Sequence, residues 1–165
     1  MAETLAQLME RLPQTGEVVW IGLRPAKREP VVVVDRVLAE VGQGLKGDRF
    51  KSRRNGKRQV TLIQHEHLQA VASFLGRDVV GPELVRRNVV VRGINLLSLK
   101  NKRFWVGDAL LEMTGLCHPC SRMEEIFGEG GYNAMRGHGG ITARVIEGGE
   151  IALGAAVKKA AGIPL

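Results

Sequence analysis

The chain has 165 residues, 44% of them hydrophobic and 25% charged, which are ordinary values for a globular domain, and its formal net charge is +7. No apolar run approaches the roughly 20 residues of a membrane-spanning helix, and residues 1–4 lack the basic start of a secretory signal, so we expect no membrane association. The two cysteines lie within one tetrapeptide, which excludes a disulfide framework and favours a reducing cytoplasm.

The first predicted element is a short helix over residues 4–12. Thr4 to Gln7 has the pattern of a capping box, apolar residues recur at helical spacing through Leu12, and Pro13 ends the helix. The strands expected next span residues 18–23, 31–38, 58–64 and 88–91, and residues 31–38 are predicted to be fully buried in part because their apolar character is continuous. One longer helix, residues 65–76, precedes the strand at 88–91.

The second half of the chain predicts two hairpins. Residues 104–106 and 109–114 flank the turn Gly107–Asp108, and residues 142–147 and 150–153 flank Gly148–Gly149. Between them, residues 123–137 favour short helical turns, and no element is assigned after Gly154.

Many short strands, glycine turns and few helices indicate a mainly β protein with a few helices (α+β), as a barrel or sandwich rather than alternating βαβ units. No linker or low-complexity tract divides the chain. We therefore expect one domain over residues 1–165, with its core at about 17–154 and the helix at 4–12 as an appendage.

The positive charge is concentrated in the middle of the sequence. Residues 46–103 carry 14 Lys and Arg against four acidic residues, a net of +10, so the remainder sums to −3. This distribution favours an anionic partner for one face. Nucleic acid is not expected, because only 4% of residues are aromatic and the basic stretches lack aromatic residues that stack on bases. A small phosphorylated ligand fits the charge distribution.

Cys117-His118-Pro119-Cys120 is the first candidate site. Two cysteines at this spacing are half of a zinc site, but no second such pair exists, and a thioredoxin-like redox motif would open a helix in a βαβ unit. Two buried thiols are the plain alternative. Arg122 follows two residues after Cys120, and a nearby cation favours the thiolate, the form that ligates metals or attacks.

Three further segments have the composition of ligand-binding loops. Gly42 to Arg49 contains closely spaced glycines whose amides can approach an anion, and residues 134–140 place His138 among glycines in a loop able to close over a site. Arg86-Arg87-Asn88 resembles a phosphate or carboxylate clamp, although strand alternation predicts that at most one of the two arginines binds. A surface loop or turn is the alternative for each of the two glycine-rich segments.

Five segments in this order resemble the MOSC domain family, named for the C-terminal domain of molybdenum cofactor sulfurases. They are GLKGDR, RQVTLIQHEHL, RRNVVVRGINL, FWVGDALLEMTGLCHPCSRM and AMRGHGGITARV. The resemblance covers about residues 17–154 and implies a β-rich fold built around a MOSC-like β-barrel.

The resemblance also implies a pterin-based molybdenum cofactor held at its phosphate by basic residues. The second cysteine of the pair matches the thiolate that ligates molybdenum in reductase members, so Cys120 is the predicted metal ligand and catalytic residue, and Cys117 is expected to be a packed or supporting thiol. Arg86 and Asn88 match the family's Arg-x-Asn motif. The remaining predicted cofactor-binding residues are Arg58, Lys46, Arg49, Arg122 and His138.

A soft thiolate suits a high-valent, sulfur-ligated metal, and the cofactor would carry the redox step. The resulting hypothesis is reduction of N-hydroxylated bases or related N-oxygenated small molecules, with electrons from partner redox proteins because the sequence has no flavin, haem or iron–sulfur motif. Two alternatives stay open: a sulfur carrier with a persulfide on Cys120, and a non-enzymatic module that binds cofactor or nucleic acid.

Overall fold

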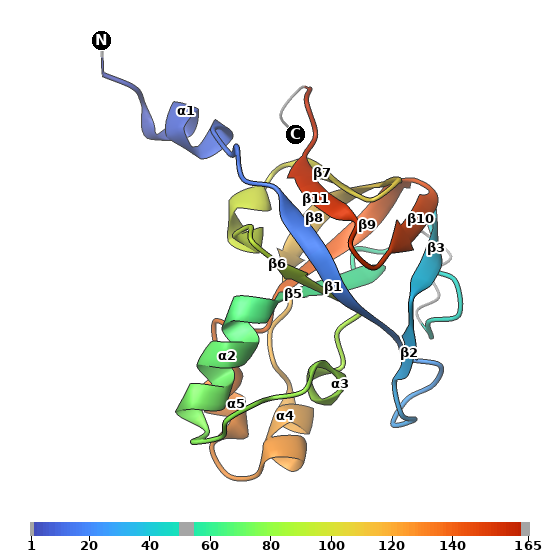
Figure 1. The fold of residues 1–165 in the computed structure, drawn as a ribbon, viewed down its shortest axis with the longest axis vertical. Coiled ribbons are helices and arrows are strands. Elements are labelled where there is room, and N and C mark those ends of the chain that lie inside the picture. Colours follow the sequence, from blue (N-terminus) through green and yellow to red (C-terminus); the bar gives the residue numbers. More distant parts are fainter. Residues whose placement is uncertain (1, 50–54, 163–165) are drawn as a thin grey trace.

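A closed β-barrel of seven strands forms the body of the protein in the computed structural model, which describes residues 2–49 and 55–162 (Figure 1). The strands follow the order β11-β7-β8-β9-β5-β6-β1, and pairing of β11 with β1 closes the ring. Their bounds are β1 (Gly16–Leu23), β5 (Val60–Gln64), β6 (Val89–Arg92), β7 (Arg103–Val106), β8 (Ala109–Leu116), β9 (Ile141–Glu147) and β11 (Ala156–Lys159). The predicted mainly β, MOSC-like barrel is confirmed.

Four further strands lie beside the barrel. The strand β2 (Val32–Val34) pairs with β1, and β3 (Arg36–Glu40), β4 (Gly44–Leu45) and β10 (Gly149–Ala152) form a separate sheet in the order β10-β3-β4.

Helices α2 (His65–Phe74), α3 (Pro82–Val85), α4 (Ser121–Phe127) and α5 (Gly131–Met135) gather at one end of the barrel, and α1 (Leu5–Glu10) lies at the other (Figure 1). A 3-10 turn, η1 (Leu96–Leu99), follows β6. The capping box of α1 is present, since Gln7 N donates to Thr4 Oγ1 at 3.1 Å and Thr4 N donates to Gln7 Oε1 at 2.8 Å. None of the helical residues of α1 is buried, as expected of an appendage.

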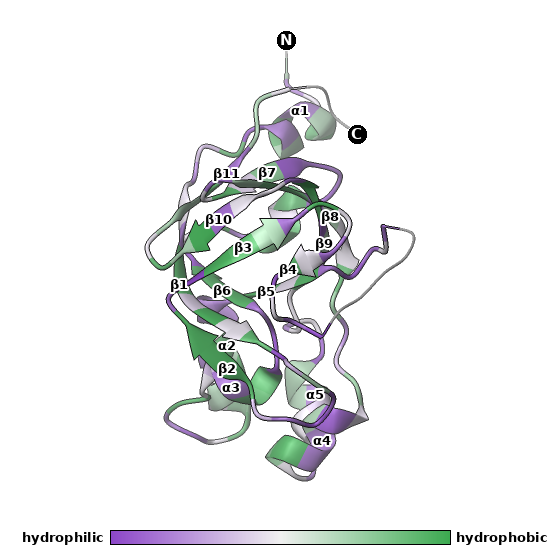
Figure 2. Ribbon diagram, turned by 90° about the vertical axis from the view of Figure 1, so that its right-hand side faces the viewer, coloured by the Kyte–Doolittle hydropathy of each residue, from purple (hydrophilic) through white to green (hydrophobic). Residues whose placement is uncertain are grey.

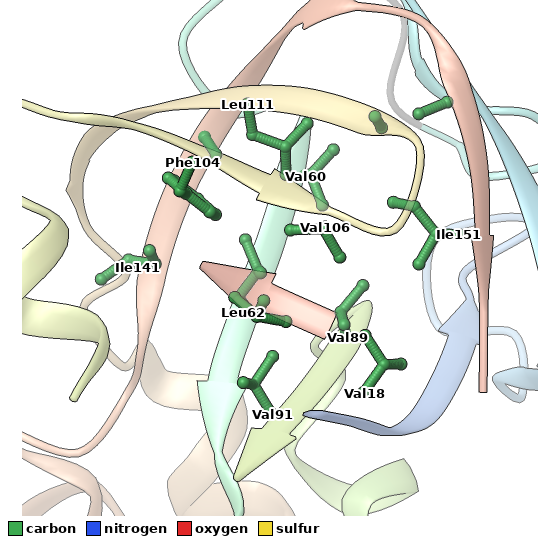
Figure 3. Packing of buried hydrophobic residues seen from close by; sticks show 14 of the residues in the cluster. Val18, Val60, Leu62, Val89, Val91, Phe104, Val106, Leu111, Ile141 and Ile151 are labelled. Atoms are coloured by element: carbon green, nitrogen blue, oxygen red, sulfur yellow. The ribbon is translucent and has the colours of Figure 1, made fainter. Parts of the chain in front are cut away.

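Two hydrophobic cores hold these elements together. The barrel interior is filled by aliphatic side chains and Phe104 (Figure 3). Alternate residues of β5 and β6 pack into different cores. Leu62 and Val89 point into the barrel, whereas Ile63 and Val90 point outward into the second core, under the helices. Every residue of β5 is buried because both faces of the strand are covered.

One parallel pair interrupts the antiparallel pattern. Leu62 of β5 pairs with Val89 of β6, and α2 and α3 make the connection between the two strands. The barrel therefore contains a single βαβ unit, which brings the residues after α3 to the end of the barrel that carries the helices.

Residues 31–38 do not form the single, partly buried strand that the sequence predicts. The chain breaks at Asp35 into β2 and β3, which belong to different sheets. Val32 and Val33 are 49% and 58% exposed and belong to neither core, whereas Val34 packs against the barrel core; β2 pairs with the end of β1 (Figure 2).

The two predicted hairpins have opposite outcomes. The hairpin of β7 and β8 is confirmed, with Val106 opposite Ala109. The hairpin predicted at residues 142–153 is wrong, because β9 pairs with β5 and β8 whereas β10 pairs with β3. The chain passes between the two sheets at Gly149, where a Cβ atom would overlap the Asp108 carbonyl group. The tail left unassigned after Gly154 forms β11.

Within residues 2–49 and 55–162, no helix has the length and apolarity needed to cross a lipid bilayer.

Candidate functional site

A strongly cationic cavity of about 340 Å³ lies where the β1–β2 loop, the end of α3 and the Cys117–Cys120 loop meet. Its described lining contains eight Lys and Arg side chains and a single carboxylate, that of Glu125. The lining residues are Arg24, Lys27, Arg28, Arg49, Arg58, Arg86, Arg87, His118, Cys120, Ser121, Arg122, Met123 and Glu125. Such a lining raises the local concentration of anions.

The two cysteines have different environments. Cys117 is buried, and its backbone N–H donates to the Gly140 carbonyl at 2.8 Å. Cys120 is exposed, lines the cavity and immediately precedes α4. The expected packed position of Cys117 is thereby confirmed, and Cys120 is the thiol that a ligand in the cavity can reach.

Arg87 lines the cavity, and two hydrogen bonds fix its guanidinium group. Its Nε donates to the Gly139 carbonyl and its Nη1 to the Val85 carbonyl, both at 2.8 Å, whereas its buried Nη2 has no hydrogen-bond partner among the described residues. Burial lowers the pKa of Arg87, and the neighbouring Cys117 and Cys120 oppose that shift. A buried N–H without a partner is costly, and an acceptor on a bound ligand would satisfy it.

Arg86 provides a second donor from a left-handed backbone conformation, with φ 55°, at the end of α3. Its Nη1 donates to the Glu29 carbonyl at 2.8 Å, and its Nη2 is buried without a described partner. Burial lowers the pKa of Arg86, and repulsion from Arg122, Arg24 and Arg49 lowers it further. An anion in the cavity would relieve that repulsion.

A buried network behind the cavity wall holds Arg24. Asp48 accepts from the Arg24 backbone N–H at 2.7 Å and from its guanidinium at 3.2 and 3.0 Å. Asn88 donates to Asp48 Oδ1 and to the Gly22 carbonyl, each at 3.1 Å, and accepts from Thr61 N and Oγ1. Burial alone would raise the pKa of Asp48, but the hydrogen bonds and charge of Arg24 outweigh it and lower the pKa.

The structure brings five predicted site residues together at the cavity, namely Cys120, Arg49, Arg58, Arg86 and Arg122. Arg58 Nη2 also lies 3.9 Å from Cys117 Sγ. Arg122 Nη1 donates to Glu125 at 3.2 Å, so its charge is shared between the cavity and that carboxylate.

Three other predicted residues are not part of the described cavity lining. Lys46 is exposed to solvent, and the fully buried amide of Asn88 is already hydrogen-bonded through both its oxygen and its nitrogen. The His138 ring packs against His67, with 4.8 Å between ring centroids, and against Phe74 at 5.5 Å. Burial, followed by repulsion from His138, lowers the pKa of His67. That Lys46, Asn88 and His138 contact a cofactor stays a prediction.

Some lining residues escaped sequence reasoning. Both Arg86 and Arg87 line the cavity, because the left-handed turn at Arg86 breaks strand alternation; that at most one of them binds stays a prediction. Arg24, Lys27 and Arg28, which follow the strand predicted at residues 18–23, were given no role from the sequence. The sequence did contain a signal for them: three cations follow directly after a predicted strand, in a chain for which an anionic ligand is expected.

Comparison with known proteins identifies the family. The model of the MOSC domain matches residues 43–158, which is more than half of the chain. The chain belongs to the MOSC domain family. No curated protein matches it at a significant level.

Solved structures agree with this MOSC fold. The YuaD protein of Bacillus subtilis is 19% identical over 89% of this chain and 97% of its own, with a TM-score of 0.76. YiiM of Escherichia coli is 19% identical over 89% of this chain and 71% of its own, with a TM-score of 0.67. YiiM of Geobacillus stearothermophilus is 17% identical over 88% and 75%, with a TM-score of 0.71. At these identities the likeness shows the fold alone.

Proposed function

We propose that this MOSC protein binds a pterin-based molybdenum cofactor in the cationic cavity and reduces N-hydroxylated bases or related N-oxygenated small molecules. One observation carries the proposal: the exposed thiol of Cys120 shares the cavity with two guanidinium groups, of Arg86 and Arg87, that each hold a buried N–H without a described partner. A soft metal ligand beside phosphate-binding donors is the combination that such a cofactor requires.

The residues present fit this cofactor. Guanidinium forks match the oxygens of a phosphate, so Arg86 and Arg87 would hold the phosphate of the pterin, supported by Arg49 and Arg58. In the described residues no three His, Cys, Asp or Glu side chains gather around a common point, so Cys120 would be one ligand to a metal whose other ligands the cofactor supplies. The bound cofactor would supply two-electron oxo transfer.

The protein's own part is to bind, orient and balance charge. Cleavage of the N–O bond of an N-hydroxylated substrate consumes two electrons and two protons and releases water. The electrons would come from a redox partner protein, in the cytoplasm, and the exposure of Cys120 at the cavity leaves the reacting centre accessible to a small substrate.

Metal analysis of protein from a cofactor-competent host tests the proposal. We expect about one molybdenum per chain in the wild type, loss of molybdenum in Cys120→Ser and retention in Cys117→Ser. Arg86→Gly should also lose cofactor, because glycine accepts the left-handed backbone of this position while removing the guanidinium. The matched control is Lys46→Ala, which removes an exposed cation outside the cavity. Wild-type protein without molybdenum, from a host that loads another molybdenum enzyme, would refute the proposal.

A sulfur carrier is the second candidate, and the contrast between exposed Cys120 and buried Cys117 favours it specifically. In that case Cys120 would hold a persulfide and deliver sulfur to an acceptor. Intact-protein and peptide mass spectrometry should then find one additional sulfur atom on Cys120 and none on Cys117, in protein that contains no molybdenum.

A further inference from the structure

The cavity holds more positive charge than a single phosphate monoester requires. Eight Lys and Arg side chains line it, and the carboxylate of Glu125 is the one negative side chain in its described lining. A phosphate monoester carries up to two negative charges near neutral pH, because its second pKa is about 6. Asp48, behind the cavity wall, already pairs with Arg24, so about half of the eight cations would remain without a counter-charge after the cofactor phosphate had bound.

Four of the eight cations fall into two groups. Arg58 and Arg87 belong to the inner group: Arg58 Nη2 lies 3.9 Å from Cys117 Sγ, and Arg87 Nε donates to the carbonyl of Gly139, whose neighbour Gly140 accepts from Cys117 N. Arg28 and Arg122 belong to the outer group, and both donate through Nη1 to the same oxygen, Oε2 of Glu125, at 3.2 Å. In this outer group one carboxylate oxygen occupies the position between two guanidinium groups that a ligand oxygen would take.

Unusual backbone conformations also occur at the cationic cavity. The non-glycine residues with positive φ in the described chain are Arg28, Asn55, Arg86 and Asn101. Asparagine tolerates the left-handed region, whereas arginine adopts it only with strain. Both strained arginines line the cavity, and Arg86 Nη1 holds the β1–β2 loop through the Glu29 carbonyl at 2.8 Å. Strain of this kind persists where a side chain has a task at a site.

We propose that Arg28 and Arg122 form a second phosphoryl-binding subsite, which the Glu125 carboxylate fills until a phosphoryl group displaces it. The inference rests on the proposed function for the identity of the first anion, and its own test does not require molybdenum. It implies that the N-oxygenated substrate is phosphorylated, as in the nucleotide form of an N-hydroxylated base.

The displacement is energetically accessible. The side chains of Arg28, Arg122 and Glu125 are 60%, 29% and 49% exposed, and ion pairs at such exposure are weak because solvent screens them. Hydrogen bonds from Arg28 and Arg122 lower the pKa of Glu125, so it remains a carboxylate at neutral pH. A phosphate monoester brings more charge and a third acceptor oxygen, so two guanidinium forks favour it over the single carboxylate.

Calorimetric titration of the purified full chain with adenosine 5′-monophosphate, with adenosine as the uncharged counterpart, tests the subsite. We expect the monophosphate to bind roughly tenfold or more tightly than adenosine. Arg28→Gly should weaken its binding roughly three- to tenfold, without disturbing a loop whose φ of 64° suits glycine. Glu125→Gln should strengthen it several-fold because the competing carboxylate is gone.

An exposed ion pair outside the cavity lining provides the matched control. Arg36 and Glu150 face each other at 3.8 Å, and Glu150 has the same 49% exposure as Glu125. Arg36→Gly and Glu150→Gln should leave the dissociation constant unchanged. Equal affinity of adenosine and its monophosphate, or wild-type affinity in both Arg28→Gly and Glu125→Gln, would overturn the inference. Absence of molybdenum with these effects intact would instead count against the proposed function alone.

The second phosphoryl group has two sources that a further measurement separates. If the substrate carries it, cofactor extracted from loaded protein should have a single phosphate by mass spectrometry, and the loaded protein should still bind adenosine 5′-monophosphate. If the cofactor carries it, the extracted cofactor should contain an attached nucleotide, and the loaded protein should no longer bind the monophosphate. A single-phosphate cofactor in loaded protein that does not bind the monophosphate would overturn the subsite.

Discussion

Asp48 shows how a single buried residue shapes the cavity without lining it. Its side chain is 1% exposed and forms two hydrogen bonds with the Arg24 guanidinium and a third with the Arg24 backbone. Asn88, the residue that follows Arg86 and Arg87, donates to Oδ1 of the same carboxylate. The Arg-x-Asn segment therefore contributes a cavity residue at one end and a positioning residue at the other.

Asp48→Asn should destabilise the protein by about 3 kcal/mol at pH 7, because it leaves the partly buried Arg24 without its counter-charge. The pKa of Asp48 is lowered in the folded state, so its contribution is present above the ordinary carboxyl pKa of about 4 and is lost as pH falls through the lower folded pKa. Urea denaturation at pH 7 and pH 3 should show the wild-type and variant stabilities converging at low pH.

Asp78→Asn, at an exposed position, is the control and should change stability by less than about 0.5 kcal/mol at either pH. A gap between wild type and Asp48→Asn that is the same at both pH values would show that the Asp48 charge is not the stabilising feature.

At the scale of elements, the loop between α5 and β9 contacts two residues of the candidate site, Arg87 and Cys117. The Gly139 carbonyl accepts from Arg87 Nε, and the Gly140 carbonyl accepts from Cys117 N, both at 2.8 Å. Gly140 has φ 86°, and a Cβ atom there would overlap the Leu62 carbonyl oxygen of β5. The glycines of this loop thus allow the close approach that sets the positions of Arg87 and Cys117.

Gly140→Ala should destabilise the protein by roughly 3 kcal/mol or more, because it combines left-handed strain with a backbone overlap in a buried region. Gly154→Ala is the matched control: its φ of 81° is also left-handed but the space around it is open, so we expect a loss of only about 1 kcal/mol. Chemical denaturation measures both. Equal losses for the two variants would contradict the role assigned to close packing at Gly140.

At the scale of the molecule, closure of the barrel depends on a short strand near the end of the described chain. The strand β11 pairs with both β1 and β7, and Val157, which has no exposed surface, lies opposite Gly16 on one side and Val106 on the other. Closure leaves the seven strands without an open edge and encloses the aliphatic core (Figure 3).

Val157→Ala should cost roughly 2 kcal/mol through the cavity it leaves in the core. For a chain of this size that loss corresponds to a fall in Tm of about 4–8 °C, measurable by calorimetry. Leu153→Ala, at a site that is 46% exposed, should lower Tm by less than about 2 °C. Similar shifts for the two variants would show that burial of Val157 at the closing strand is not decisive.

Local pattern in the sequence determined the elements whose residues carry their own period or turn signal. The helix from His65, the hairpin of β7 and β8 and the buried strand β5 are present as predicted, apart from a residue or two at their ends. The family resemblance, carried by segments in a fixed order, correctly indicated the barrel. Within the site, the Cys117–Cys120 loop was found from the spacing of its two cysteines, and Arg86 from its match to the Arg-x-Asn motif of the family.

The tertiary structure alone decided what depends on partners distant in sequence. The split of residues 31–38, the separation of β9 from β10 and the closure by β11 follow from strand pairings between segments far apart, which no local period encodes. In the same way, Arg24, Arg28 and Arg87 joined the cavity, and Asn88 and His138 fell outside its lining. A side chain's environment is set by every chain segment that packs against it, and its neighbours in sequence are only some of these.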